Sequence, residues 1–283
     1  PKSDGLYISG NLNSLDMETI KSYAGRAHNP DLPDLTLKEV DITTQSLSIL
    51  GQDLSNVRLQ VVPDGADFNV GISNAAINGR VRMPANMSSR DTITARFDKL
   101  DLKTKSSKVA DNVDITSLPA IDFAANNVSI NALPFGHVDF NMVPAPRGMA
   151  IRSLLISNKH MNLKASGNWV KTGSGMLTNL QGGIEASNVS ALLDSFGYDV
   201  RNFISNKGSL KFNLAWASAP YSPDLDKMSG SASLMLDQGR IVELGETSGA
   251  KMDLGRLLSI FSLQTIPRRL SLDFSDLFQK GYS

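Results

Sequence analysis

The sequence contains no cysteine, and aromatic residues make up 6% of its 283 positions. The lack of cysteine excludes a disulfide framework, a thiolate metal site and a cysteine nucleophile. Lys and Arg number 28, as do Asp and Glu, so neither sign of charge is in excess. Because binding to phosphates needs an excess of basic residues, this balance argues against a nucleic-acid partner. The length fits one large domain or two ordinary ones.

Long apolar runs are also missing. No stretch approaches the ~20 residues that cross a bilayer, so we expect no membrane-crossing segment in this sequence. The chain begins at Pro1 without an initiator methionine or a signal-like apolar region, and it ends at Ser283 soon after an apolar run. We interpret it as a fragment of a longer protein.

Residue patterns typical of enzymes are scarce. His28, His137 and His160 stand alone, with no second ligand at a metal-binding spacing. The glycines at 173, 175, 182 and 183 are followed by no Lys-Ser/Thr pair, so they indicate turns rather than a phosphate loop. Asp273 and Asp276 leave a two-acid hydrolase as a distant alternative. We therefore expect no enzyme, no metal site and no cofactor.

Apolar residues recur at every second position through most of the chain, which is the spacing of a strand with one buried face. Between Gly208 and Trp216, for example, Ser209, Lys211 and Asn213 alternate with apolar residues. One apolar face and one solvent-exposed polar face are typical of antiparallel sheets. Short turn sequences, such as Pro63-Asp64-Gly65, separate the runs and predict a meander. We expect a mainly β fold.

Three segments have helical character instead. They are Ser14–Tyr23, residues 190–196 and residues 253–263. In the second, Ser190 is the expected N-cap, Leu192, Leu193 and Phe196 share one side, and Gly197 follows the last turn. Segments this short suit plugs or end caps of a sheet.

The sequence also echoes itself. Pro33 and Pro119 each follow a leucine and are 86 residues apart, as are Met83 and Trp169. Such an echo predicts repeated β units that contact mainly their neighbours. We divide the chain into residues 1–30 (a strand and a short helix), 31–110 (first repeat), 111–206 (second repeat) and 207–283 (C-terminal segment with the helix at 253–263).

The alternating pattern supplies more apolar surface than the few helical segments can cover. A β-sandwich or a barrel would bury this surface within itself. An open, curled sheet would instead leave an apolar groove for a ligand. Periodicity alone does not distinguish the two arrangements.

The C-terminal sequence carries a more specific signal. Residues 255–282, GRLLSIFSLQTIPRRLSLDFSDLFQKGY, resemble the signature of the YhdP branch of the AsmA-like family. The order of the preceding elements, from Gly208–Trp216 through Ala219-Pro220 to the turn at Asp237–Arg240, is similar to that family as well. So are the repeats that begin with Leu-Pro and the helix around Leu192. Residues before Asn29 match loosely.

The resemblance implies a periplasmic protein of Gram-negative bacteria that is anchored to the inner membrane by an N-terminal helix absent here. It implies phospholipid transport toward the outer membrane along an extended β-groove, without catalysis. Phospholipids, the inner membrane and outer-membrane components are the partners it suggests. A structural or adhesive β-repeat module with a closed core is the alternative.

The family provides no list of lipid contacts, so we take the expected groove lining from the alternation in this sequence. The expected lining residues are Val138, Phe140, Met161, Leu163, Leu210, Phe212, Leu214, Trp216, Leu234, Leu236, Leu270, Leu272 and Phe274. Ordinary core packing is the alternative role for each.

Overall fold

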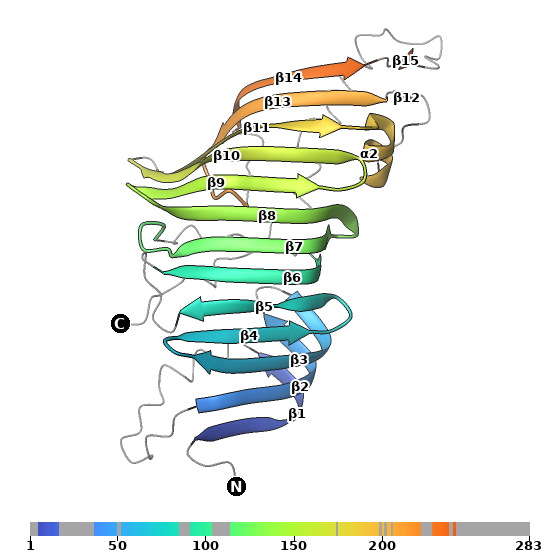
Figure 1. Ribbon diagram of the computed structural model, residues 1–283. Coiled ribbons are helices and arrows are strands. Elements are labelled where there is room, and N and C mark those ends of the chain that lie inside the picture. The colour runs from blue at the N-terminus through green and yellow to red at the C-terminus, as the bar shows by residue number, and fades with distance from the viewer. Residues whose placement is uncertain are drawn as a thin grey trace.

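The computed structural model describes residues 5–16, 37–49, 52–84, 91–103, 114–173, 175–197, 200, 203–204, 206–221, 228–237 and 240–241. Most of them belong to one sheet of 13 strands (Figure 1). Its strands, in spatial as well as chain order, are β1 (Leu6–Asp16), β2 (Leu37–Ile49), β3 (Gln52–Asp64), β4 (Asp67–Ser73), β5 (Ile77–Pro84), β6 (Thr92–Leu102), β7 (Ala120–Ile130), β8 (Leu133–Ala145), β9 (Gly148–Ser157), β10 (Met161–Thr172), β11 (Gly175–Ala186), β13 (Lys207–Trp216) and β14 (Ser229–Asp237).

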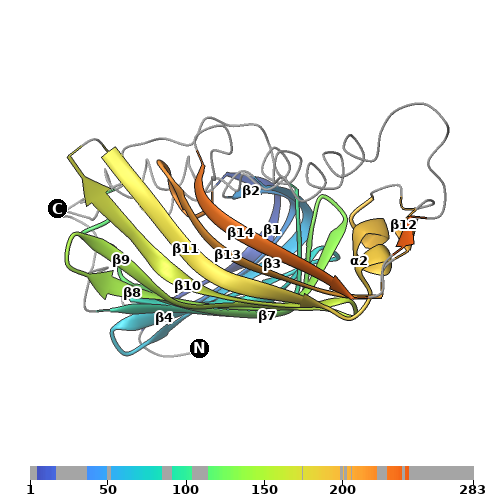
Figure 2. The same cartoon turned by 90° about the horizontal axis from the view of Figure 1, so that it is seen from above.

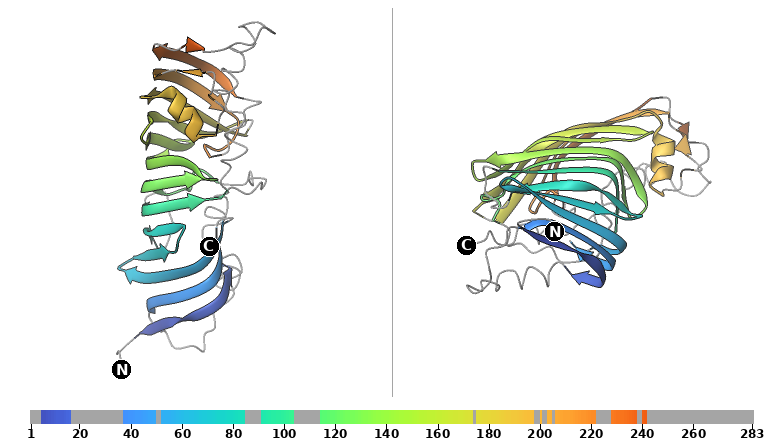
Figure 3. Two further views of the ribbon diagram at one scale, coloured as in Figure 1. Left: turned by 90° about the vertical axis from the view of Figure 1, so that its right-hand side faces the viewer. Right: turned by 60° about the horizontal axis from the view of Figure 1, so that its bottom comes forward.

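The sheet curls along its length but does not close. Strands β1 and β14 form its two edges and are not neighbours. Figures 2 and 3 show the strands stacked in one layer that bends into a trough-like curve. The prediction of a mainly β, curled and open sheet is confirmed, and the sandwich and barrel alternatives are wrong for the described residues. Strands β12 (Phe203–Ile204) and β15 (Arg240–Ile241) form a separate two-stranded sheet.

Two strand pairs run parallel, which the prediction of an antiparallel meander missed. They are β1 with β2 and β6 with β7. Parallel neighbours require the chain to return to the same end of the sheet, so they need long connections. Residues 17–36 and 103–119 supply these connections. Apart from these two pairs the sheet is antiparallel: β2–β6 form a run of five strands, and β7–β11 with β13 and β14 form a run of seven. The division of the chain into repeats remains a prediction.

One short helix, α2 (Val189–Ser195), is present among the described residues. The side chain of Asn188, rather than the predicted Ser190, caps it by accepting a hydrogen bond from the Ala191 amide at 2.8 Å. Asn is as good an N-cap as Ser, so the pattern alone did not decide between neighbouring positions. Gly197, with φ of +80°, follows the last turn as predicted.

The other two predicted helices have different outcomes. Ser14–Asp16 belong to β1, so the helix predicted over Ser14–Tyr23 does not begin where expected. Pairing of β1 with β2 overrides the local capping pattern there. The rest of that segment, and the helix predicted over 253–263, lie outside the described residues. In the part of the chain that the structure describes, no helix is both long and apolar enough to span a membrane.

Candidate functional site

Directly paired positions on neighbouring strands place their side chains on the same face of a sheet. Following the register from β1 to β14 therefore traces rows of side chains across the sheet. One such row, the first row, contains no polar side chain. Its members are Ile8, Val40, Val61, Val70, Val81, Ala95, Phe123, Phe140, Leu154, Ala165, Gly182, Phe212 and Ala232.

A second row lies two residues away on each strand, always toward the same end of the sheet, and is equally apolar. The two rows make one continuous apolar band across all 13 strands. We call the surface that carries this band the inner face. The members of the second row are Gly10, Ile42, Leu59, Ile72, Gly79, Phe97, Ala125, Val138, Ile156, Leu163, Ile184, Leu210 and Leu234.

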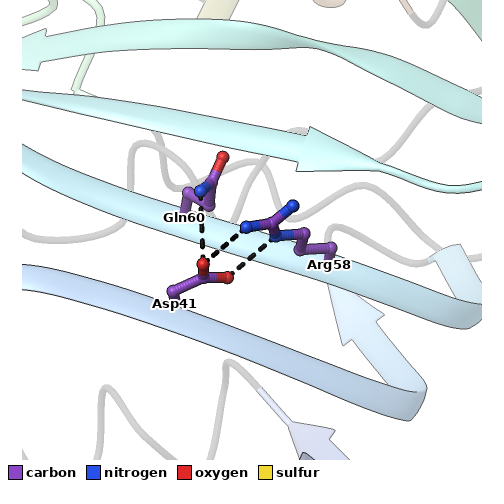
Figure 4. Close-up of polar contacts among 3 residues, drawn as sticks. All are labelled: Asp41, Arg58 and Gln60. Carbon is purple, nitrogen blue, oxygen red and sulfur yellow. Dashed lines mark hydrogen bonds and ion pairs between the residues drawn. The ribbon is translucent and has the colours of Figure 1, made fainter. Parts of the chain in front are cut away.

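The opposite, outer face carries polar side chains and ion pairs. Arg58 binds Asp41 through two hydrogen bonds of 2.9 and 2.6 Å, and Gln60 donates to the same carboxylate at 3.3 Å (Figure 4). The hydrogen bonds and positive charge of Arg58 lower the pKa of Asp41 below its ordinary value. Arg82 pairs with Asp67 on the same face at 2.8 Å. The two faces of the sheet thus differ sharply in polarity.

The apolar face is the concave one. Helix α2 packs on it through Leu192 and Leu193, which share a buried cluster with Met161 and Ala186. Figure 2 shows α2 on the side toward which the sheet curls. The curl therefore surrounds the apolar band and turns the ion pairs outward to water.

Ten of the expected lining residues lie in the described part of the chain, and the structure brings all ten to the inner face. Phe140 and Phe212 belong to the first row, and Val138, Leu163, Leu210 and Leu234 belong to the second. These six are partly buried. Leu270, Leu272 and Phe274 lie outside the described residues, and lipid contact by any member of the set remains a prediction. The other four inner-face residues are Met161, Leu214, Trp216 and Leu236.

Two of these residues are packed within the protein. Met161 is 7% exposed and lies against α2, and Trp216 is 4% exposed. The indole of Trp216 donates a hydrogen bond to the Ala219 carbonyl at 3.0 Å. Leu236, by contrast, is 39% exposed on the edge strand β14. The inner face is thus covered at Met161 and Trp216 and exposed at Leu236 on the edge strand.

Sequence reasoning missed half of the apolar band. The rows continue through β2–β6, where Val61, Val70 and Val81 align as closely as the residues in the C-terminal half. It also missed Leu154 and Ile184, which lie between the expected positions on neighbouring strands. Their period-two spacing was visible in the sequence. Their alignment was not, because register depends on which strands pair.

The glycines at 182 and 183 lie inside β11, so their interpretation as a turn is wrong. Gly182 pairs with Ala165 on one side and Phe212 on the other, within the first row. A Cβ at this position would overlap the Lys164 carbonyl oxygen, and it would lie 2.7 Å from the Ala165 Cβ. Glycine is therefore required here by close backbone approach.

The inner face is covered at one end of β8–β11 by two segments outside the 13 strands. Ile115 and Leu118 come from the first segment and Ala219 from the second, and they bury Met149 and Trp169. We call this region the covered end. Asp114, beside it, has a lowered pKa, chiefly because Thr116 donates hydrogen bonds from its hydroxyl and amide at 2.7 and 3.1 Å. The positive charge of Lys171 adds to this effect.

Of the histidines and aspartates considered as enzyme candidates, the structure describes His137 and His160. His137 is not isolated as predicted, since its Nε2 lies 2.7 Å from the Asp139 carboxylate on the outer face. The backbone amide of His160 donates to the Asn158 side chain in the β9–β10 turn. Within the described ranges, no three His, Asp or Glu side chains gather in a way that would hold a metal ion. His28, Asp273 and Asp276 lie outside those ranges.

Comparison with known proteins adds to this geometry. The model of a family described as "YhdP protein" matches residues 1–283. Over 148 residues the chain is 27% identical to the "Intermembrane phospholipid transporter YhdP" of Escherichia coli (strain K12). Those residues are 52% of this chain and 11% of the E. coli protein, so the chain spans about a tenth of that relative. No solved structure matches the chain.

Proposed function

The chain belongs to the YhdP family, and on this basis we propose that its inner face carries phospholipid acyl chains between the inner and outer membranes. The observation that carries the proposal is the apolar band, which crosses all 13 strands of an unclosed sheet. The E. coli relative is, by its name, a phospholipid transporter and not an enzyme. The inner face needs no catalytic group for this task.

The length of the band suits a path better than a pocket. Thirteen strands at about 4.8 Å spacing extend about 58 Å. One leaflet of a bilayer contributes about half of the ~30 Å hydrocarbon core, so an extended acyl chain covers a fraction of this path. We infer that several lipids occupy the band in succession.

The uniformity of the band favours movement along it. Burying a methylene contributes about 0.8 kcal/mol, so a sixteen-carbon chain gains on the order of 10 kcal/mol from an apolar surface. A single pocket with this affinity would release lipid slowly. A chain that slides from Phe140 to Leu154 to Ala165 exchanges similar contacts at each step. The net barrier to sliding is therefore small.

The open side of the curl gives the headgroup a place in water. Burying an unpaired phosphate is prohibitively costly, so we expect it to remain at the open side while the acyl chains lie on the inner face. In this proposal the chain works in the periplasm of the cell envelope. A helix outside this sequence would attach it to the inner membrane, and outer-membrane components would receive the lipid.

Photocrosslinking tests the proposal directly. Benzoylphenylalanine replaces Phe212 on the inner face or, as the matched control, Lys211 on the outer face of the same strand. In cells with radiolabelled phospholipid, we expect labelled crosslinks from position 212 and none from position 211. Equal labelling at both positions, or none at either, would contradict the proposal and favour a structural β-repeat module.

A further inference from the structure

The two tryptophans of the chain occupy one row of the inner face, on either side of Thr178. Trp169 on β10 pairs with Thr178 on β11, which in turn pairs with Trp216 on β13. Trp169 is 1% exposed and Trp216 is 4% exposed. The two indoles thus have the same type of strand position, Trp169 at the covered end and Trp216 two strands away in the same row.

They differ in their hydrogen bonds. The Trp216 Nε1–H donates to the Ala219 carbonyl at 3.0 Å, and the Thr178 hydroxyl donates to the Ser218 carbonyl at 2.6 Å. The Trp169 Nε1–H is buried and has no acceptor among the described residues. A buried donor without a partner is rare and destabilising, so it calls for an explanation.

The surroundings of Trp169 are apolar. Ile115, Leu118 and Met149 pack in the same buried cluster. The Tyr221 ring meets the indole edge-on, with ring centres 6.0 Å apart and an interplanar angle of 81°. Ile115, Leu118 and Tyr221 belong to segments outside the 13 strands. They cover Trp169 without adding a strand over it.

Beyond Trp169, the same strand places a cation at its end. Lys171 lies two residues further along β10, on the same face, and its side chain is exposed. The inner face therefore presents an apolar band, then an unpaired N–H donor, then an ammonium group. A diacyl phospholipid has matching groups in the same order: acyl chain, ester carbonyl and phosphate.

We propose that the Trp169 indole N–H donates a hydrogen bond to an ester carbonyl oxygen of bound phospholipid, while Lys171 contacts the phosphate. This inference rests on the proposed function and deepens it by assigning a headgroup-proximal site. Lipid reaches the site by displacing the side chains of Ile115, Leu118 and Tyr221. The carbonyl then supplies the acceptor that Trp169 lacks.

The test compares W169F with W216F. Both remove an indole N–H and keep an aromatic ring, but only the second N–H has a partner in the described structure. The probes are dioctanoyl phosphatidylglycerol and its dioctyl ether analogue, which keeps the phosphate but has no carbonyl. Calorimetry gives the Kd of the purified chain for each lipid, and thermal unfolding gives its Tm.

We expect W169F to weaken binding of the diacyl lipid about fivefold and to leave binding of the ether lipid unchanged. Both tryptophan variants should lower Tm, because each removes ring volume at a buried position, and W216F should lower it further because its N–H also has a partner to lose. W216F should keep the wild-type preference for the diacyl lipid. Lys171→Gln should weaken binding of both lipids alike, because both carry the phosphate.

Three results would contradict these expectations. If W169F binds both lipids as the wild type does, the carbonyl site is wrong and the proposed function stands. If W169F weakens binding of both lipids equally, the role of Trp169 is structural and the inference is again overturned. If the wild-type chain binds neither lipid, the proposed function itself fails.

Discussion

The Arg96 guanidinium binds the Asp122 carboxylate at 2.6 Å across the parallel pair β6 and β7. On the opposite face of the same junction, the rings of Phe97 and Phe123 have centres 6.0 Å apart. This junction joins the antiparallel run β2–β6 to the antiparallel run that begins at β7. An ion pair secures its outer face and aromatic packing secures its inner face.

The aromatic side of this junction should contribute more to stability. Arg96 and Asp122 are 44% and 42% exposed, and such pairs contribute at most about 1 kcal/mol. We expect Asp122→Asn to lower the free energy of unfolding by less than about 1 kcal/mol. Phe123→Ala should lower it by about 2 to 3 kcal/mol, below the range for a fully buried ring. Urea unfolding of both variants checks the order, and a larger effect of Asp122→Asn would contradict it.

A carboxylate in the apolar band should stop lipid passage without unfolding the sheet. Phe212 and Leu234 are partly buried on the last two strands, so an Asp side chain there can still reach water. We expect Phe212→Asp and Leu234→Asp to keep the wild-type circular dichroism spectrum and to abolish phospholipid transfer. Lys211→Asp, on the outer face of β13, is the control and should transfer normally. Global unfolding of the inner-face variants would instead support a sealed core.

The glycine at 182 should tolerate no side chain. A Cβ added at this position would overlap the Lys164 carbonyl oxygen. Gly182→Ala should therefore lower the free energy of unfolding by about 1 to 3 kcal/mol through overpacking. Gly71→Ala is the matched control, since its Cβ would lie 3.7 Å from the Gln60 Cβ in ordinary contact. It should be neutral or slightly stabilising, because alanine restricts the unfolded chain. If urea unfolding shows the same loss of stability for both variants, the close backbone approach at position 182 does not determine the effect.

Acid should remove the contribution of the Asp41 carboxylate to the stability of the fold. The folded pKa of this carboxyl is lowered, chiefly by hydrogen bonding to Arg58, so its contribution to stability is present above the ordinary value of 3.8. It is lost as the pH falls below 3.8 through the lowered folded pKa. We expect Asp41→Asn to flatten the stability profile in this window, because it removes a small contribution that is present near pH 7 and already lost in acid. An unchanged acid slope, measured by urea unfolding at each pH, would contradict this assignment.

Local pattern and long-range pairing contributed differently to the site. The alternation of Leu210, Phe212 and Leu214 predicted their shared face, and the structure confirms that they share it. The same reasoning misplaced Gly182 in a turn, because the need for glycine there arises from Ala165 and Lys164 on a neighbouring strand. It also left Trp169 outside the site, since its unpaired N–H is visible only once its neighbours are known.

The sequence by itself determined that the chain forms strands with one apolar and one polar face, because period-two spacing is a local property of the backbone. It also carried the family resemblance. The tertiary structure alone decided that β1–β2 and β6–β7 run parallel, that the apolar side chains align in unbroken rows, and that the sheet stays open. Pairing direction, register and closure depend on contacts between residues distant in the chain, which no local pattern specifies.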